Sequence, residues 1–369
     1  MKIAILGTRG IPNNYGGFEQ FAEYLSAGLV KKGHDVTVYN PHYHTYTIPE
    51  YNGVRIIKKY NPEKFLGSAA NYLYDYLCLK DALNQGFDII LECGYTSAPV
   101  SYYMCRINKS VIITNMDGME WKRKKWSYFP RLLIKRAEQL AVKRSHHLVV
   151  DNIIIQKYYK KKYKKDISCI PYGADIFNDP DEKKIKKYGL EPGNYFLTVA
   201  RIVPENNIEM ILQGYIDSGS EKKLLIIGNP GDKYGSFLAK KYSRHKNIIF
   251  YGDLYYQEDL DNLRYFSSLY FHGHSVGGTN PSLLESMATG CLVCAHDNIY
   301  NHSVIEDNAL YFKSRHDVSD LIKNADQYIS DKDIFVKNNH AKIQEIYSWD
   351  KVVGEYEEFF AGITGKQRQ

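Results

Sequence analysis

The sequence predicts an α/β protein built from two consecutive doubly wound domains. Short apolar runs that are typical of buried strands alternate with helical stretches, as a parallel sheet requires. The alternation restarts near the middle of the chain, and a length of 369 residues suits two domains of ordinary size. Because ligands bind outside the carboxyl ends of the strands in such sheets, we expect the two domains to face each other across a cleft.

The first series of elements opens with a β-loop-α-β pattern. The run "KIAILGT" ends in a glycine, and the helical stretch after it places Phe21, Leu25 and Leu29 on one face before Gly33. Further strands are expected at "DVTVYNP", "DIILECG", "SVIITNMDG" and "HHLVVDN". We therefore assign residues 1–171 to an N-terminal domain.

The second series begins after "PYGAD", a turn-rich candidate hinge. Strands are expected at "NYFLTVAR", "KLLIIGNPG", "NIIFYGD", "LYFHGHS" and "CLVCAHDN", with helices at about 206–218 and 281–289. We assign residues 172–345 to a C-terminal domain. Residues 346–369 are expected to form a final helix that packs back toward the first domain.

Composition and cysteine usage indicate a globular protein of the cytosol. Hydrophobic residues make up 44% of the chain and charged residues 24%. No apolar run approaches the ~18 residues that a membrane span needs, and "MKIAILGTRGIP" lacks the pattern of a signal peptide. Cys291 and Cys294 form a lone CxxC within an expected strand, so we interpret the six cysteines as reduced structural thiols.

The loop after the first strand, "GTRGIPNNYGGFE", leads into a helix through Gly16 and Gly17. Its glycine spacing does not match the GxGxxG pattern of dinucleotide sites. Glycines at a helix start allow close backbone approach, and the partial positive charge there favours phosphate. We therefore predict that Gly16 and Gly17 contact an anionic ligand, with a plain turn as the alternative.

Three charged residues follow expected strands at the edge where the ligand crevice lies. Arg201 and Glu205 follow "YFLTV", and arginine is the natural bidentate partner of a phosphate. Asp117 follows "VIIT" within "NMDGMEWKRKKW", where a carboxylate can orient or deprotonate an incoming hydroxyl. The alternatives are a surface ion pair for Arg201 and an Asp-Gly turn for Asp117.

The stretch "HGHSVGGTNPSLLESMATG", residues 272–290, predicts an anion site at a helix start. Pro281 suits the first helical turn, Thr279 or Asn280 can cap it, and the first N–H groups then point outward. Glu285 lies about one turn further in, where its carboxylate can accept two hydroxyl hydrogen bonds, as from a ribose. The two histidines at the start of the stretch are interpreted as buried structural residues rather than metal ligands.

The second half of the chain resembles the retaining glycosyltransferases of family 4. These enzymes have the GT-B fold, in which two Rossmann-like domains face each other across a cleft. "LLESMA" matches the second glutamate of the family's paired-glutamate signature at Glu285, and Gly277 stands in the place of the first. "VARIVPENN" is similar to the family's Gly-Arg…Glu-Lys segment, with Arg201 and Glu205 present and Asn206 in place of the lysine.

A narrower resemblance covers almost the whole chain. "GTRGIPNNYGGFE", "DGMEWKRKKW" and "HGHSVGGTNPSLLE" together resemble the bacterial rhamnosyltransferases that build cell-wall and capsular polysaccharides. The resemblance implies dTDP-β-L-rhamnose as donor, a sugar on a polyprenyl diphosphate as acceptor, and a β-1,4 linkage formed with retention. Gly277 suits a 6-deoxy sugar, because it leaves room and removes a charge that would bind sugar hydroxyls.

The motifs and the resemblance together give a set of candidate site residues. The candidate catalytic residues are Asp117 and Glu205. The candidate donor-binding residues are Gly16, Gly17, Arg201, Asn206, Gly277, Gly278, Thr279, Asn280, Ser282 and Glu285. We expect no metal and no other cofactor, because the acidic pairs Asp179–Asp181 and Asp259–Asp261 are interpreted as surface acids.

Residues 121–144 hold nine lysines and arginines, one acid and several aromatic residues. Basic residues attract anionic lipid, and tryptophan and tyrosine favour the headgroup level. We therefore predict a peripheral protein at the cytoplasmic face of the membrane, docked on the inner leaflet so that a lipid-linked saccharide reaches the cleft. The candidate docking residues are Trp121, Lys122, Arg123, Lys124, Lys125 and Trp126. A solvated helix face is the alternative, and no nucleic acid is expected because no recognised binding module is present.

Other functions stay open at this point. One is a family 4 glycosyltransferase that uses a UDP- or GDP-sugar. More distant alternatives are a dinucleotide-binding Rossmann oxidoreductase, which would need a GxGxxG loop, and a non-catalytic protein that binds sugars.

Overall fold

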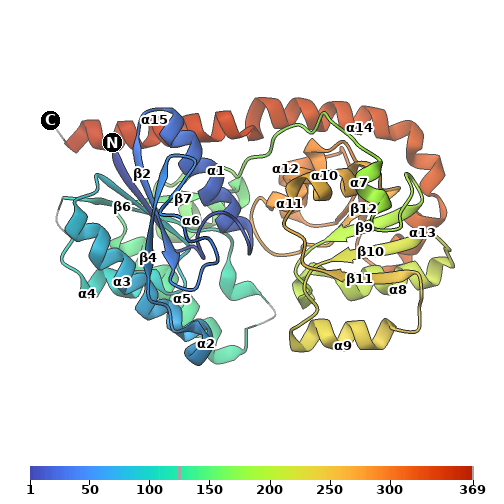
Figure 1. The fold of residues 1–369 in the computed structure, drawn as a ribbon, viewed down its shortest axis with the longest axis horizontal. Helices are drawn as coiled ribbons and strands as arrows, with labels where there is room; N and C mark the ends of the chain where they lie inside the picture. Colours follow the sequence, from blue (N-terminus) through green and yellow to red (C-terminus); the bar gives the residue numbers. More distant parts are fainter. Residues whose placement is uncertain (108, 124–125, 368–369) are drawn as a thin grey trace. The chain divides into compact units, whose positions relative to one another are not determined.

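The computed structural model describes residues 1–107, 109–123 and 126–367, and it divides the chain into two compact α/β units (Figure 1). Unit 1 contains Met1–Lys122, Trp126–Tyr172 and the last helix from Trp349. Unit 2 contains Arg123 and Gly173–Ser348. Each unit has its own sheet and its own hydrophobic core, as the repeated alternation in the sequence predicts.

The sheet of unit 1 has eight strands in the order β3-β4-β2-β1-β5-β6-β7-β8. All neighbours pair in parallel except β3 and β4. In register, Ile3 lies opposite Val36 on one side and Ile89 on the other. The strands are β1 (Lys2–Leu6), β2 (Asp35–Pro41), β3 (Glu50–Tyr51), β4 (Val54–Lys59), β5 (Ile89–Cys93), β6 (Val111–Asn115), β7 (His147–Val150) and β8 (Ser168–Cys169).

Helices cover both faces of this sheet. Ala4 and Leu6 of β1 join a core with Tyr74, Cys78 and other residues of α3 and α4, so the alternate side chains of β1 face the opposite layer. The helices are α1 (Gly17–Lys31), α2 (Glu63–Leu66), α3 (Ala70–Gln85), α4 (Ala98–Met104), α5 (Tyr128–Arg144), α6 (Ile153–Tyr163) and α15 (Trp349–Gln367). Two 3₁₀ turns, η1 (Gly67–Ala69) and η2 (Glu120–Lys122), lie between them.

The last helix, α15, packs on α1 within unit 1. The ring of Trp349 stacks on Tyr24 with centroids 4.7 Å apart, and Lys32 forms a 2.8 Å ion pair with Glu357. A Cβ at Gly28 would lie 2.5 Å from Val353, so the two helices approach closely only because residue 28 is glycine.

The sheet of unit 2 has six parallel strands in the order β11-β10-β9-β12-β13-β14. The strands are β9 (Tyr195–Val199), β10 (Lys223–Ile227), β11 (Ile248–Gly252), β12 (Leu269–His272), β13 (Val293–His296) and β14 (Leu310–Phe312). The helices are α7 (Lys183–Lys186), α8 (Ile208–Ser218), α9 (Lys233–Tyr242), α10 (Gln257–Tyr265), α11 (Pro281–Ala288), α12 (Ile299–Ile305), α13 (Arg315–Lys323) and α14 (Ile329–Lys342). A 3₁₀ turn, η3 (Pro204–Asn206), precedes α8, a second, η4 (Ala325–Tyr328), precedes α14, and a π-helical turn (Ile343–Tyr347) follows α14.

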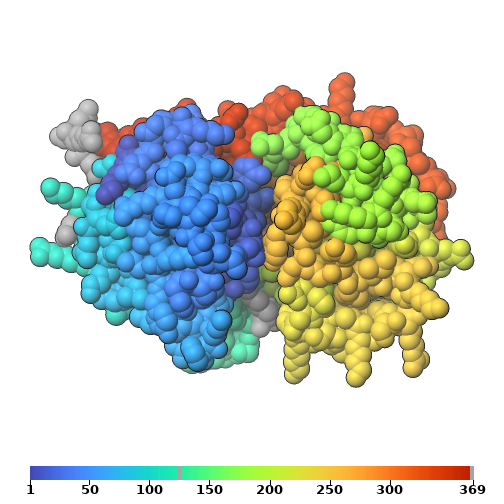
Figure 2. Space-filling view, viewed as in Figure 1, coloured from blue at the N-terminus to red at the C-terminus, as the bar shows by residue number. Residues whose placement is uncertain are grey.

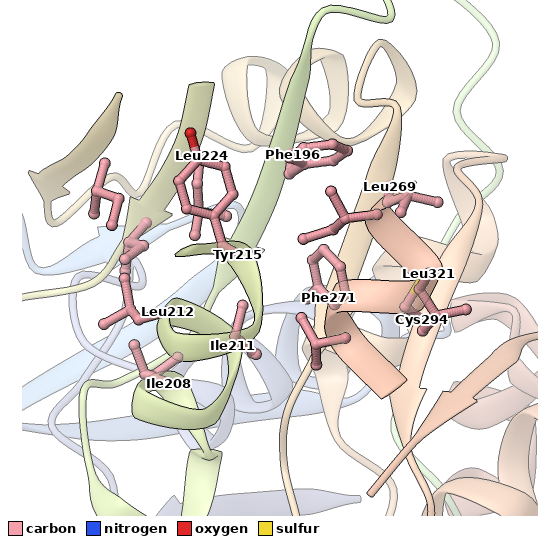
Figure 3. Packing of buried hydrophobic residues seen from close by; sticks show 14 of the residues in the cluster. Phe196, Ile208, Ile211, Leu212, Tyr215, Leu224, Leu269, Phe271, Cys294 and Leu321 are labelled. Atoms are coloured by element: carbon pink, nitrogen blue, oxygen red, sulfur yellow. The ribbon is translucent and has the colours of Figure 1, made fainter. Parts of the chain in front are cut away.

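The core of unit 2 lies between the sheet and helices α8, α9 and α13. Figure 3 shows Ile211 and Tyr215 of α8 turned toward Phe196 and Phe271 on the strands. This packing follows from the 3.6-residue spacing of the apolar positions in α8. Helix α9 lies at the outer surface, where the space-filling view shows long side chains projecting from this segment (Figure 2).

In each sheet the strand order reverses at one position. Loops at these positions carry candidate site residues. In unit 1 the reversal lies between β1 and β5, and in unit 2 it lies between β9 and β12. The carboxyl ends of such strand pairs leave a crevice, because the following connections run away in opposite directions. The loops after β1, β9 and β12 are the loops in which the sequence places its glycines, Arg201 and the 272–280 stretch.

Candidate functional site

The loop from β12 into α11 presents the start of the helix without a side-chain cap. Asn280 occupies the N-cap position and Pro281 is the first helical residue, but the Asn280 side chain makes no capping hydrogen bond. The expectation that Asn280 caps the helix is therefore wrong, and Thr279 is buried in the loop. Gly277 has φ = 146°, a conformation that side chains other than hydrogen rarely allow. The outcome is a tight loop that leads straight into the positive end of a helix dipole.

The segment after β9 is joined to this loop by hydrogen bonds. The backbone N–H and the hydroxyl of Ser275 donate to the carbonyl of Glu205 at 3.0 and 2.7 Å. The side-chain amide of Asn207 donates to the carbonyl of Gly273 at 2.8 Å. Because of these contacts, the arginine that precedes η3 and the glycine-rich loop form one surface at the reversal point of the sheet.

Arg201 supplies an exposed cation on that surface. Burial of the His274 ring, followed by the nearby charge of Arg201, lowers the pKa of His274 to about 3. The His274 ring stacks on His272 with centroids 4.3 Å apart, and burial holds the pKa of His272 well below its ordinary value. Both histidines are therefore neutral, and Arg201 provides the positive charge beside the loop.

The side chains of Glu205 and Asn206 are buried under the surface that carries Arg201. The Glu205 side chain is fully buried, and its carboxylate oxygens accept no hydrogen bond within the described residues. The Asn206 side chain, also buried, donates to the carbonyl of Arg201 at 2.8 Å. Neither side chain is exposed to solvent in this structure, and the predicted roles of Glu205 and Asn206 stay predictions.

Glu285 projects from α11 and forms an ion pair with Arg264 of α10. The guanidinium of Arg264 is 1% exposed, and it also lies 3.3 Å from the carboxylate of Asp261. Burial raises the pKa of Asp261 to about 6, although Arg264 opposes the shift. The carboxylate of Glu285, which is predicted to bind a ribose, is thus held by the buried guanidinium of Arg264. The sequence does not indicate this pair, because the two residues come from different helices.

Ser282 is used inside unit 2. Its hydroxyl lies 2.5 Å from the hydroxyl of Tyr270 and donates to the carbonyl of Val199 at 3.1 Å. These contacts fasten the first turn of α11 to the ends of β9 and β12. The donor-binding role of Ser282 stays a prediction, and in this structure its hydroxyl bonds within unit 2.

In unit 1, the loop after β1 has its amides bonded to acidic side chains of α1. The backbone N–H of Arg9 donates to Glu19 at 2.7 Å, and that of Asn13 donates to Glu23 at 2.6 Å. The N–H of Gly16, the N-cap of α1, donates to the side chain of Asn13 at 3.2 Å. A ligand anion at Gly16 would have to replace this last bond.

Asp117 follows β6 at the carboxyl edge of the unit 1 sheet. Its φ of 45° is left-handed, and its N–H donates to the side chain of Asn115 at 3.0 Å. Asp is one of the few residue types that adopt this conformation at moderate cost. The short turn places Asp117, which is half-buried, between the buried strand and the buried residues Gly118 and Met119.

The predicted docking residues fall into two groups. The indole N–H of Trp121 donates to Glu138 and that of Trp126 donates to Glu120, so both tryptophans have polar partners inside unit 1. Lys122 is exposed and Arg123 is half-buried. Lys124 and Lys125 lie outside the described residues.

The acidic pair Asp259–Asp261 was expected at the surface, and this expectation is wrong. Asp259 is mostly buried and accepts from Lys187 at 2.5 Å and from Tyr188 at 2.8 Å, whereas Asp261 faces Arg264. Both carboxylates therefore belong to structural ion pairs. No group of three or more His, Cys, Asp or Glu side chains that could hold a metal ion occurs in the part of the chain that the structure describes. All six cysteines are unpaired thiols.

Comparison with solved structures decides the fold. Sucrose-phosphate synthase from Thermosynechococcus elongatus superimposes with a TM-score of 0.80 over 99% of both chains, at 14% sequence identity. Anabaena HepE in complex with UDP-glucose superimposes with a TM-score of 0.78 over 98% of this chain and 100% of that one, also at 14% identity. The chain has the GT-B fold.

Sequence comparisons assign the two halves of this GT-B protein separately. Residues 180–348 match the family model "Glycosyl transferases group 1", and residues 1–175 match a model described as a domain of unknown function (DUF1972). A curated relative, the alpha-monoglucosyldiacylglycerol synthase of Streptococcus pneumoniae, is 28% identical over 206 residues, which is 51% of this chain. The match spans 44% of that relative, less than half of its length. Residues 180–348, within unit 2, are therefore similar to the glycosyl transferases of group 1.

Proposed function

We propose that the protein is a retaining glycosyltransferase that transfers a sugar from a nucleotide-sugar to a lipid-linked saccharide. The observation that carries the proposal is the start of α11, which lacks a side-chain cap and lies in the same surface as exposed Arg201, in a segment similar to the glycosyl transferases of group 1. Helix N-termini and arginine are the two protein groups that best hold a diphosphate.

The donor would be held by three contacts in unit 2. The first N–H groups of α11 and the guanidinium of Arg201 bind the diphosphate, and the carboxylate of Glu285 accepts hydrogen bonds from the nucleoside sugar. The same positive groups stabilise the charge that develops on the leaving diphosphate. In a reaction with retention on one face of the sugar, the proton of the acceptor hydroxyl ends on the leaving diphosphate oxygen, either directly or by way of the Asp117 carboxylate. No metal is required for this chemistry, and independence from Mg²⁺ is our expectation.

Asp117 is proposed to orient or deprotonate the acceptor hydroxyl. Asp117 follows a buried strand at the carboxyl edge of the unit 1 sheet. Its left-handed backbone conformation fixes the direction of its Cα–Cβ bond. Glu205 is the second proposed catalytic residue, and its carboxylate is buried and accepts no hydrogen bond within the described residues.

L-Rhamnose from dTDP-β-L-rhamnose is the donor that we propose, with a β-1,4 linkage as product. Support comes from the resemblance of the three long motifs and from Gly277, whose position leaves no carboxylate to bind the hydroxyls of a more polar sugar. A UDP- or GDP-sugar is the alternative donor, since the HepE structures were solved with UDP and UDP-glucose.

The proposed acceptor is a saccharide linked to polyprenyl diphosphate in a membrane, and a surface of unit 1 supports this proposal. In the described residues no helix is both long and apolar enough to pass through a bilayer. Helices α4 and α5 contact each other and expose large apolar side chains beside basic ones. The apolar set is Tyr103, Met104, Tyr128, Phe129, Leu132 and Leu133, with Tyr128 and Phe129 78% and 68% exposed.

The charge of this surface, hereafter the α4–α5 surface, is entirely positive. The exposed charged residues of α5 are Lys135, Arg136, Lys143 and Arg144, and the one acid of the helix, Glu138, is buried. Exposed apolar side chains next to several cations match the surface of an anionic membrane. The apolar side chains insert into the bilayer interface, and the anionic headgroups attract the cations. Elsewhere on the same unit, Phe65 of α2 is 84% exposed.

The experiment that tests the proposed donor site compares two exposed arginines. Arg201→Ala should weaken donor binding about 10- to 150-fold, the effect of losing hydrogen bonds to a charged group. Arg244→Ala, in an exposed turn of the same unit, should leave donor binding unchanged. Equal donor affinity of the two variants, measured by titration with the nucleotide-sugar, would remove Arg201 from the site.

A further inference from the structure

We infer that Glu138 is a positioning residue that holds the loop carrying Asp117 through the indole of Trp121. The inference rests on the proposed role of Asp117 toward the acceptor. Nothing in the sequence motifs assigns Glu138 a role, because it lies inside α5, the helix that follows this loop, and outside the quoted motifs.

The carboxylate of Glu138 is fully buried and accepts hydrogen bonds from four donors. The indole N–H of Trp121 lies 2.9 Å from one oxygen. The other oxygen accepts from Tyr158 at 2.9 Å, Tyr163 at 2.6 Å and Lys162 at 2.7 Å. A buried carboxylate is tolerated only when it is paired and bonded, and here each oxygen has at least one donor.

The three donors from α6 explain part of the lysine-rich run at residues 157–165. Tyr158, Lys162 and Tyr163 point their polar ends at Glu138, and the Lys162 ammonium balances its charge. Burial would lower the pKa of Lys162, but its bonds to Glu138 and the two tyrosines outweigh burial and raise that pKa. These residues hold the Glu138 carboxylate in one position, in which it also accepts the hydrogen bond from Trp121.

Trp121 is the point at which the loop 117–122 meets this acceptor. On the other side of the loop, the N–H of Glu120 donates to the hydroxyl of buried Tyr95 at 3.0 Å. Asp117 starts the loop in a left-handed conformation, which persists only where its surroundings determine it. Tyr95 and Glu138 therefore hold two neighbouring residues of the loop, in addition to the backbone bonds of η2 and the burial of Met119.

The structure offers a matched pair of variants. Trp121→Phe keeps an aromatic ring and removes the N–H that reaches Glu138. Tyr158→Phe removes a different donor from the same carboxylate and leaves the loop contact in place. If Glu138 positions the loop, only the first variant should loosen it, although both delete one hydrogen bond to Glu138.

Hydrogen exchange of the amides of residues 117–121, followed by mass spectrometry on the full chain, reads the loop without any assay of activity. We expect exchange about tenfold faster or more in Trp121→Phe, and unchanged exchange in Tyr158→Phe. Glu138→Gln, which cannot accept from all four donors, should give the Trp121→Phe result if it folds. Equal exchange in Trp121→Phe and wild type would overturn the inference.

Kinetics then separate positioning from the proposed function. Trp121→Phe should lower kcat and leave the donor KM unchanged, while Tyr158→Phe should change neither. A looser loop with unchanged kcat would contradict the positioning role and leave the glycosyltransferase proposal standing. Wild-type protein without turnover on any nucleotide-sugar would contradict the proposed function, and the exchange data would still decide whether Glu138 holds the loop.

Discussion

The guanidinium of Arg264, 1% exposed, forms an ion pair with the carboxylate of Glu285. Arg264 comes from α10 and Glu285 from α11, so the pair fixes the direction of a carboxylate that projects at the helix turn beside the candidate diphosphate site. A carboxylate held in this way needs no reorientation when a hydroxyl binds. The pair therefore links the stability of unit 2 to its proposed affinity for a donor.

Glu285→Ala should raise the donor KM about 10- to 150-fold, because hydrogen bonds to a charged group contribute about 1.5–3 kcal/mol. Steady-state kinetics at saturating acceptor measure the change. A folded variant with an unchanged donor KM would show that Glu285 does not hold the nucleoside sugar.

Arg264→Met is the companion to this variant, since it removes the cation and keeps the carboxylate. Loss of one partner of a buried pair leaves the other uncompensated, and we expect about 3–5 kcal/mol lower free energy of unfolding. Denaturant titration gives this value. A loss below about 1 kcal/mol would mean that Glu285 is placed by other contacts.

Asp117→Asn should lower kcat by about 100-fold or more and leave the donor KM nearly unchanged, because a general base acts in the transition state. The substitution keeps the size of the side chain and its tolerance of a left-handed backbone. Near-normal kcat at saturating acceptor would assign the acceptor-side base to another residue.

The α4–α5 surface should bind vesicles that contain anionic lipid. Replacing Lys135, Arg136, Lys143 and Arg144 by glutamine should weaken binding by up to about 1 kcal/mol for each cation near the surface. Vesicle sedimentation measures the binding, and replacing Lys183, Lys184, Lys240 and Lys241 in unit 2 is the matched control. Equal loss in both sets, or no loss in either, would remove the α4–α5 surface as a lipid-binding site.

The free energy of unfolding should fall as the pH falls below about 6.5, in part because of His274. Its pKa is about 3 in the folded protein and about 6.5 when unfolded, so the unfolded state binds more protons between these values. Each pH unit in this window should lower the free energy of unfolding by about 1.4 kcal/mol on account of this histidine. Denaturant titration of wild type and His274→Asn at pH 6 and pH 5 isolates the effect, and identical pH slopes would contradict it.

The order of strands and helices was predictable from sequence because apolar periodicity is local. The helix expected at 281–289 is α11, Pro281–Ala288, and the one expected at about 206–218 is α8, Ile208–Ser218, which begins after Asn207 in its left-handed conformation. The loops that carry the candidate site follow the strands that the apolar runs predict. The sequence therefore located the candidate loops before any side-chain contact was known.

The buried charges were not predictable in the same way. Arg264 and Glu138 reach their partners across different helices, and no spacing in the sequence marks such pairs. The polar neighbours of Asp259 and Asp261 predict surface acids, whereas Lys187 and Arg264 pair with them in the fold. Tertiary contacts decide whether a charged residue is solvated or buried, and these contacts come only from the structure.

The most direct test of the central claim is a donor panel with wild-type protein and a polyprenyl-diphosphate-linked saccharide. Release of nucleoside diphosphate would be measured with dTDP-β-L-rhamnose and with UDP- and GDP-sugars, each with and without EDTA. The account predicts release that depends on the acceptor, is fastest with dTDP-β-L-rhamnose and is largely unaffected by EDTA. Release with a UDP- or GDP-sugar alone would contradict the proposed donor, and no acceptor-dependent release with any donor would contradict sugar transfer itself.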